Sequence, residues 1–510
     1  MFFELNGCIR PRRAHFFGLI SPSAPGALPT RAQSWALRGY QYHSDASSSS
    51  TSSTTRETEI ANRRPGTKPS PPPLSILPYS SLIRSWAINA ISSTPWLLNP
   101  SLAIMSRLTH SKSMFFNPDR NVILREFLKR TFYSQFCAGE NGKEVRGTIE
   151  HLKKLGYQGV ILGYAREVVL NSAAIDEMKG QGGGPQAAAR AVQEIDLWKK
   201  GTLETVSLAC ENDFVALKFS GAGCQALYDL SRNVSPARIL EDAITEICDH
   251  AANRGVCLLF DAEQQAIQAG IDSWALEYMR RYNTNRSARR AVIYNTYQAY
   301  LKATPSILSQ HLSIARKDGF TLGVKLVRGA YLGSDPRHLI NDTKEQTDQM
   351  YDGISDGLIQ RSHNSVLRPT PGESEDFPRV SVVLASHNRR TVRAAQALRE
   401  AQAQKTNGNT ENTIDLVYAQ LQGMADDVSC ELVQARRLAS DMPTGTDKQQ
   451  GVYLPSAYKY LVWGTTGECM KYLLRRAEEN RDAVARTREG RIALGKEFWR
   501  RMRCAVGMSR

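Results

Sequence analysis

The stretch Leu322-Gly-Val-Lys-Leu-Val-Arg328 is a short apolar run rich in branched side chains, and a longer helical pattern follows it. Seven more runs of this kind recur along the chain, at 159–164, 214–220, 256–261, 292–298, 380–387, 416–421 and 458–462. Continuous apolar strands that alternate with helices are typical of a parallel sheet covered on both faces. Eight such units predict an α/β fold, a (β/α)8 barrel.

An open, doubly wound sheet is the alternative fold. No G-x-G-x-x-G fingerprint follows any of the runs, which favours the barrel. The one glycine cluster, Gly180-Gln-Gly-Gly-Gly184, follows no strand and is interpreted as a flexible loop. Two polar insertions, 362–379 and 403–412, are interpreted as exposed loops without chemistry.

The chain before the barrel divides into three parts. Residues 1–45 are rich in arginine, with Glu4 and Asp45 as their only acids, which is typical of a mitochondrial transit peptide. A disordered basic tail is the other interpretation. Residues 46–80 are rich in serine, threonine and then proline, and predict a disordered linker.

Residues 81–155 have a helical pattern, with 121–130 as the clearest amphipathic run. Within it, 82–108 is interrupted by Pro95 and Pro100 and predicts a packed helix pair or a membrane-surface element. We assign 156–505 to the barrel.

The overall composition excludes several classes of protein. The 510 residues carry 65 Lys and Arg against 50 Asp and Glu, a net charge of +15 that could indicate nucleic acid. No zinc-ligand spacing, helix-turn-helix or RNA-binding signature accompanies it, so we expect no nucleic-acid partner and no metal. The nine dispersed cysteines indicate reduced thiols. The chain has no run of 18 apolar residues, so we expect no spanning helix.

Polar side chains follow seven of the eight predicted strands, where barrels of this kind place their catalysis. They are Lys218, Asp261, Gln298, Lys325 with Arg328, His387 with Asn388, Gln420, and the aromatic run Tyr458-Lys-Tyr460. Each alone has a structural explanation: Lys218 could lie along a rim, and Asp261 could cap a helix. Together they suit an anionic ligand. A phosphate-bearing cofactor would use Lys325, Arg328, His387 and neighbouring helix N-termini.

The segment Tyr472-Leu-Leu-Arg-Arg-Ala-Glu-Glu-Asn480 follows the eighth strand. On a helix, Tyr472, Arg475, Arg476 and Glu479 share one face. Paired guanidinium groups beside an aromatic ring suit a small carboxylate. A solvated, salt-bridged helix face is the alternative. For both arginines to reach a substrate, this last helix must lie over the barrel mouth.

Seven of these motifs together resemble the proline dehydrogenases, in the family's order. They are Lys218-Phe-Ser220, Asp261-Ala-Glu-Gln264, Lys325-Leu-Val-Arg-Gly-Ala-Tyr331, Ala385-Ser-His-Asn388, Gln420-Leu-Gln-Gly-Met424, Tyr458-Lys-Tyr460 and 472–480. The resemblance implies a distorted (β/α)8 barrel, with an N-terminal helical segment, that holds non-covalent FAD in its mouth. It implies oxidation of L-proline to Δ1-pyrroline-5-carboxylate, with electrons passed to a membrane quinone. The implied type is monofunctional, mitochondrial and fungal-like, in peripheral contact with the matrix side of the inner membrane.

The resemblance also implies roles on the substrate side. Arg475, Arg476 and Lys218 would pair with the proline carboxylate, and Glu479 would orient Arg476. Asp261 would support Lys218.

Three side chains would enclose the pyrrolidine ring: Tyr460, Tyr472 and Leu421. Asp261 would also support Tyr460. A bulky ring at Tyr460 favours proline over hydroxyproline, because relatives preferring hydroxyproline tend to carry a smaller residue there.

On the cofactor side, the resemblance implies that Gln298 and Lys325 contact the isoalloxazine. Many bacterial members have arginine in place of Lys325. Backbone contacts would come from Val327, Gly329, Ala330 and Tyr331, and the pyrophosphate and adenosine would be held by Thr343, Thr347, His387 and Asn388.

Three alternatives remain open from the residues. A hydroxyproline dehydrogenase is one. A Schiff-base aldolase on the same barrel would use Lys218 or Lys325 as its nucleophile. A barrel with a degenerate, non-enzymatic site is the third.

Overall fold

The structure is a computed structural model, and it describes most of the chain after residue 70. The described residues are 71–111, 113–165, 185–285, 290–372, 374–405, 413–441, 452–482 and 484–508, all within the compact unit Ser70–Arg510. The expected transit peptide and the glycine cluster Gly180–Gly184 lie outside them and stay predictions.

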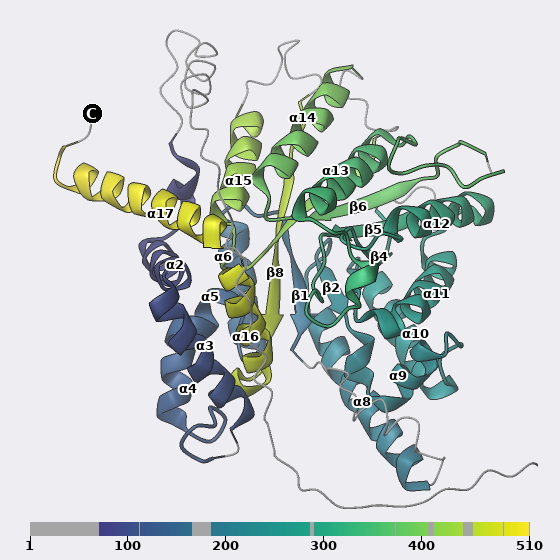
Figure 1. Ribbon diagram of the computed structural model, residues 1–510, viewed down its shortest axis with the longest axis horizontal. Coiled ribbons are helices and arrows are strands. Elements are labelled where there is room, and N and C mark those ends of the chain that lie inside the picture. The colour runs from purple at the N-terminus through teal and green to yellow at the C-terminus, as the bar shows by residue number, and fades with distance from the viewer. Residues whose placement is uncertain are drawn as a thin grey trace, which may run out of the picture. The chain divides into compact units, whose positions relative to one another are not determined.

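Eight parallel strands close into a barrel in chain order (Figure 1), which confirms the predicted fold. β1 pairs with β8 over six residues, from Gly159 opposite Tyr458 to Tyr164 opposite Trp463, and closes the ring. All eight predicted runs fall on strands. These are β1 Gly159–Tyr164, β2 Phe214–Leu217, β3 Cys257–Phe260, β4 Ile293–Gln298, β5 Leu322–Val327, β6 Val380–Ala385, β7 Asp415–Leu421 and β8 Ser456–Trp463.

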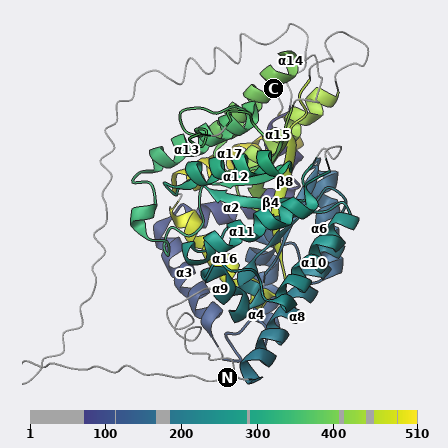
Figure 2. The ribbon, with the colours of Figure 1, turned by 90° about the vertical axis from the view of Figure 1, so that its right-hand side faces the viewer.

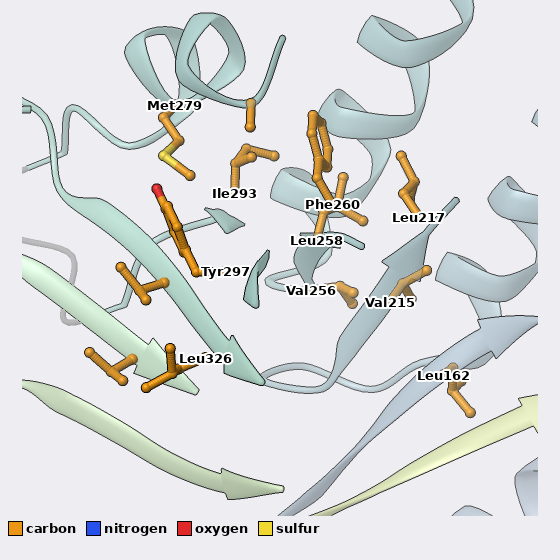
Figure 3. Close-up of a cluster of buried hydrophobic side chains, with 14 of the residues drawn as sticks. Leu162, Val215, Leu217, Val256, Leu258, Phe260, Met279, Ile293, Tyr297 and Leu326 are labelled. Atoms are coloured by element: carbon orange, nitrogen blue, oxygen red, sulfur yellow. The ribbon is translucent and has the colours of Figure 1, made fainter. Parts of the chain in front are cut away.

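Side chains alternate between the barrel interior and the helical shell, as the pleat of a strand requires. Inside, Phe214 packs edge-on against Tyr294 and Tyr458, with ring centroids 5.4 and 5.5 Å apart. Outside, residues such as Leu258 and Ile293 form one buried cluster with Met279 of α11 (Figure 3). This alternation decides which strand residues can line the mouth.

The helical shell follows the strands in sequence. Its elements are α8 Pro185–Leu208, η3 Phe219–Ala222, α9 Cys224–Ser231, α10 Arg238–Asn253, α11 Gln265–Tyr282, α12 Thr304–Asp318, η4 Arg337–Leu339, α13 Lys344–Gln360, α14 Arg389–Lys405 and α15 Asp426–Ser440. The insertion 362–379 is irregular wherever it is described, as predicted. The second predicted loop, 403–412, is wrong at its start, because α14 continues to Lys405; residues 406–412 lie outside the described part.

Helices before β1 form a separate layer. They are η1 Pro73–Ile76, α2 Tyr79–Ser92, α3 Pro95–His110, α4 Val122–Leu128, the π-helical turn η2 Lys129–Tyr133, α5 Ser134–Phe136 and α6 Gly142–Lys154. The predicted linker to residue 80 is wrong over 73–80, since η1 buries Leu74, the following Leu77 is also buried, and α2 begins at Tyr79. The helix pair expected over 82–108 is confirmed as α2 and α3. None of the described helices is long and apolar enough to cross a membrane.

Two helices follow β8, namely α16 Thr466–Asp482 and α17 Val484–Ala505. The sequence had suggested that the Tyr472 helix is the last; the structure adds α17, which packs on α2. α16 lies against α3 (Figures 1 and 2). Tyr472 and Leu473 of α16 share a buried cluster with Val462 and Tyr460 of β8 and with Leu421 of β7. α16 therefore covers part of the barrel mouth, as predicted.

Candidate active site

Three residues from three strand ends meet inside the barrel mouth. The Lys325 ammonium lies 2.5 Å from one oxygen of Asp261, and the Tyr460 phenol donates to the other oxygen at 3.1 Å. The same ammonium lies 5.2 Å from the centroid of the Tyr460 ring. Asp261 and Lys325 are both buried, so this ion pair is held in a region of low dielectric. The expected support of Tyr460 by Asp261 is confirmed, and Lys325 is the partner that sequence reasoning missed.

Gly163 of β1 makes room for Tyr460. A Cβ atom at this position would lie 2.9 Å from the Tyr460 hydroxyl, closer than carbon and oxygen normally approach. The neighbouring strand thus fixes where the phenol can lie.

The helix α16 presents buried groups to this mouth. Arg476 and Tyr472 are each only 6% exposed, and the guanidinium lies 4.9 Å from the Tyr472 ring centroid. Arg475 is half-buried. The solvated-face interpretation of this helix is therefore wrong for Arg476 and Tyr472. The side chain of Glu479 lies outside the described residues, so its role stays a prediction.

The N-terminus of α16 is held by acids from the N-terminal helical layer. Glu140 accepts from the backbone nitrogen and the hydroxyl of Thr466, at 3.0 and 2.8 Å. Asp119 accepts from the backbone nitrogen of Gly467 at 3.0 Å. Carboxylates at a helix N-terminus satisfy its free donors and complement the dipole.

Glu140 is ionised in this setting. Burial alone would raise the pKa of Glu140, but hydrogen bonds from Lys129 and Thr466 outweigh it and lower that pKa. Glu140 follows no predicted strand and lies 326 positions before its partner Thr466, so the pattern of polar residues at strand ends does not predict it.

The loop after β5 offers polar atoms for a cofactor. Gln298 is buried and accepts from the Ala330 backbone nitrogen at 3.1 Å, while its own amide nitrogen has no hydrogen-bond partner among the described residues. Gly329 has φ +154°, and a Cβ there would lie 2.5 Å from the Tyr300 ring. Gly329 and Ala330 are exposed, so a ligand can reach this loop, although the Ala330 nitrogen is already bonded to Gln298.

Two helix N-termini stand near these strand ends. Thr343 caps α13 through a capping box with Gln346, and Thr347 lies one turn later. Asn388 accepts from the Thr391 backbone nitrogen at 3.3 Å and so caps α14. The Nε2 atom of His387 accepts from the backbone nitrogen of Leu421 at 3.1 Å, which ties the loop after β6 to β7. Helix N-termini with such caps can bind phosphate groups.

Arg328 has a structural task, and its expected phosphate contact stays a prediction. Its guanidinium donates to Asp348, Ser386 and Thr391, at 2.7, 2.7 and 2.9 Å. Burial would raise the pKa of Asp348, but hydrogen bonds from Lys344 and Arg328 lower it. Each of the three guanidinium nitrogens donates one of these bonds, so Arg328 joins β5 to α13, α14 and the loop after β6.

Two more strand-end residues differ in their surroundings. Gln420 points away from the mouth: its amide nitrogen donates to the Ser386 carbonyl and its amide oxygen accepts from the Ser429 hydroxyl. Lys218 is half-buried at the end of β2, where its carbonyl accepts from the Trp198 indole at 3.0 Å. Its support by Asp261 stays a prediction.

A cavity of about 520 Å³ lies elsewhere, against the outer face of β8. Arg84, Tyr157 and Lys459 line it. Lys459 is paired there with Asp426 at 2.8 Å, on the opposite side of the strand from Tyr460. The convergent strand-end residues place the candidate chemistry inside the barrel mouth.

A closed parallel barrel with a buried ion pair in its mouth and an arginine-bearing helix across that mouth has the architecture of the (β/α)8 enzymes. The comparisons give the family. A model of the family described as proline dehydrogenase matches residues 145–489, and the chain belongs to this family. It is an oxidoreductase acting on the CH–NH group of proline.

Relatives and solved structures agree with this assignment. A probable mitochondrial proline dehydrogenase of Schizosaccharomyces pombe is 30% identical over 83% of this chain and 88% of its own length. A hydroxyproline dehydrogenase of Rattus norvegicus is 26% identical, over 74% and 82%. Proline utilization A from Bdellovibrio bacteriovorus has a TM-score of 0.54 at 17% identity, over 84% of this chain and 41% of that one, and so shares the fold.

Proposed function

We propose that this protein oxidises L-proline to Δ1-pyrroline-5-carboxylate with FAD as its cofactor, and passes the electrons to a membrane quinone. It works at the matrix side of the mitochondrial inner membrane, in peripheral contact with it. The observation that carries the proposal is the burial of Arg476 and Tyr472 beside Tyr460 and Leu421, over the Asp261–Lys325 pair.

The carboxylate of proline provides most of its orientation, because the rest of the molecule is a small apolar ring. Arg475 and Arg476 bind the carboxylate from above, and Lys218 binds it from the end of β2. A guanidinium can give two parallel hydrogen bonds to one carboxylate, which fixes an angle as well as a position. Holding the reacting carbon at a fixed place is itself a large part of the rate gain.

The ring of proline is enclosed by Tyr460, Tyr472 and Leu421, which exclude water from the reacting carbon. The Asp261–Lys325 pair keeps Tyr460 in position through the hydrogen bond to the phenol. The ring nitrogen must be unprotonated before the adjacent carbon can give up a hydride.

The cofactor side of the mouth fits a flavin. When bound, FAD supplies the acceptor for the hydride. The buried amide nitrogen of Gln298 is a donor that has no partner within the described part of the chain, and Lys325 lies on the next strand. The remaining contacts would come from Val327, Gly329, Ala330, Tyr331, Thr343, Thr347, His387 and Asn388.

Hydroxyproline oxidation is the second candidate, favoured by the similarity to a hydroxyproline dehydrogenase. Tyr460 argues for proline, because a bulky ring in the pocket leaves less room for a substituted substrate, and Gly163 and Asp261 hold that ring in one position. Replacing it by Tyr460→Ser should shift the kcat/KM ratio toward 4-hydroxyproline; an unchanged ratio would remove Tyr460 from the account of specificity. A Schiff-base role for Lys325 is disfavoured, since an ion-paired ammonium has no lone pair for attack.

Product analysis tests the proposal. Purified full-length protein with L-proline and a soluble quinone should yield equal amounts of Δ1-pyrroline-5-carboxylate and quinol. Absence of both products from flavin-containing protein would reject it.

A further inference from the structure

The loop between α3 and α4, at the lower left of Figure 1, and the helix α4 that follows it carry exposed apolar side chains. Six large apolar side chains within 14 positions are exposed there, which is rare on a free protein surface. Phe115 is 76% and Ile123 83% exposed. We call this surface the apolar tip, and it consists of Met114, Phe115, Phe116, Val122, Ile123 and Phe127.

The backbone beneath the apolar tip is folded. The side chain of Asn121 donates to the Phe115 carbonyl at 2.9 Å, and the Asn117 backbone nitrogen donates to the Ser113 carbonyl at 2.9 Å. Pro118 is buried under the loop. The aromatic side chains are thus presented outward by an ordered turn.

The helix α4 is apolar on two faces. Leu124 and Leu128 belong to the buried cluster that also holds Tyr472. Ile123 and Phe127, four positions apart, share another face and are exposed. Packing against the buried cluster explains why Leu124 and Leu128 are apolar. No packing among the described residues explains why Ile123 and Phe127 are apolar.

Charge around the apolar tip is mostly positive. The two acids of residues 95–130 already have partners: Asp119 accepts from Gly467, and Glu126 pairs with Arg130 at 2.7 Å. Of the nearby basic residues, Lys129 pairs with Glu140 and Glu144, and Arg130 pairs with Glu126. Arg107, Arg120 and Arg125 have no acidic partner among the described residues and supply the positive charge. Apolar side chains that project from a basic surface complement an anionic bilayer, which takes the apolar groups into its interface and attracts the cations.

We propose that the apolar tip is the surface by which this protein docks on an anionic lipid bilayer. The inference rests on the proposed transfer of electrons to a membrane quinone, and it names the part of the chain that meets the membrane. Asp119 bonds the same loop to the start of α16, so the docked surface is joined directly to the helix that carries Arg475 and Arg476.

Vesicle flotation with the full-length protein tests this proposal. The test variant is Phe115→Ser with Ile123→Ser, and the matched control is Tyr228→Ser with Val234→Ser, which removes two exposed apolar side chains from the barrel side. Vesicles of phosphatidylcholine with phosphatidylglycerol should float the wild type and the control. The test variant should bind at least about tenfold more weakly, because each apolar side chain contributes its burial to membrane affinity. Circular dichroism confirms that each variant is folded.

A second variant separates charge from burial. Arg120→Glu with Arg125→Glu should weaken binding to the anionic vesicles about tenfold or more and leave the weak binding to pure phosphatidylcholine unchanged. Proline-dependent reduction of a soluble dye is measured in parallel and should be the same in all variants. Loss of proline-dependent dye reduction in the wild type would count against the proposed function and would leave the docking proposal unaffected. Wild-type protein that does not float, or a test variant that floats like wild type, would overturn the docking proposal, and the latter result would point to a protein partner.

Discussion

Replacing Asp261 by asparagine tests whether the buried contacts of Asp261 with Lys325 and Tyr460 hold the site in place. The carboxylate holds the Lys325 ammonium at 2.5 Å and the Tyr460 hydroxyl at 3.1 Å, and both charged groups are buried. Asn keeps the shape and removes the charge. Removing one partner of a buried pair costs about 3–5 kcal/mol, and the phenol bond adds about 1 kcal/mol.

We expect two effects of Asp261→Asn. The free energy of unfolding falls by about 3–6 kcal/mol, and kcat/KM for proline falls at least about a hundredfold, because Tyr460 loses the group that positions it. Tyr460→Phe removes the phenol bond alone and should lower kcat/KM by about tenfold or less. Thermal unfolding and dye-linked turnover measure the two quantities.

The control is Asp229→Asn. Asp229 is a buried carboxylate whose partners, Gln225 and the Ala237 backbone, lie in and after α9. Its replacement should leave kcat/KM within about twofold of wild type. If Asp261→Asn keeps wild-type kcat/KM and stability, or if Tyr460→Phe is the more damaging change, the reasoning from the buried pair is refuted.

Four more predictions follow from the geometry. Arg475→Lys and Arg476→Lys should each raise KM for proline by about tenfold or more while flavin stays bound, since lysine cannot form a forked pair; unchanged KM would exclude carboxylate binding. Glu140→Gln should raise KM severalfold with kcat little changed, because the start of α16 loses an ionised cap at Thr466; equal kinetics would show that the cap does not position the helix. His311 is 7% exposed, and burial lowers its pKa from 6.5 to about 4, so its contribution to stability is present above pH 6.5 and is lost as pH falls toward 4, by about 2 kcal/mol at pH 5. His311→Gln should flatten that part of the pH dependence of unfolding, and an unaltered slope would contradict it. The rate of flavin reduction by proline should rise from neutral to mildly alkaline pH, since only the unprotonated amine reacts; a flat profile would count against that step.

The barrel was accessible to sequence reasoning because parallel strands are buried on both faces and so read as apolar runs. The residues at which the strands end were harder to predict than the strands themselves. The second run was expected to reach Ser220, but β2 ends at Leu217, because Phe219–Ala222 turns into the 3-10 helix η3.

The partners of site residues were harder to predict. Asp261 and Lys325 are 64 positions apart, and only closure of the barrel brings them together. Gln420 could have been excluded by alternation, because Ala419 belongs to the interior cluster and its neighbour must face the shell. The structural bonds of Arg328 could not be predicted either, because its partners Asp348 and Thr391 lie near the starts of helices that show no strand-end signal.

The position of α16 depends on contacts that have no local signature. Glu140 and Asp119 reach its N-terminus from the N-terminal helical layer, and the 3.6-residue pattern of α16 itself says only that it is amphipathic. Its arginines were recognised as candidates from their spacing, whereas the burial of Arg476 needed the tertiary structure.

The central claim is that proline is bound beneath α16, beside the flavin. Anaerobic titration of purified full-length protein with L-proline, followed by the flavin absorption spectrum, tests it most directly. We predict that wild-type protein carries flavin that bleaches with proline, and that Arg476→Lys retains the flavin and bleaches only at proline concentrations about tenfold higher or more. Protein without flavin, flavin that proline does not bleach, or an identical titration curve for Arg476→Lys would contradict the account.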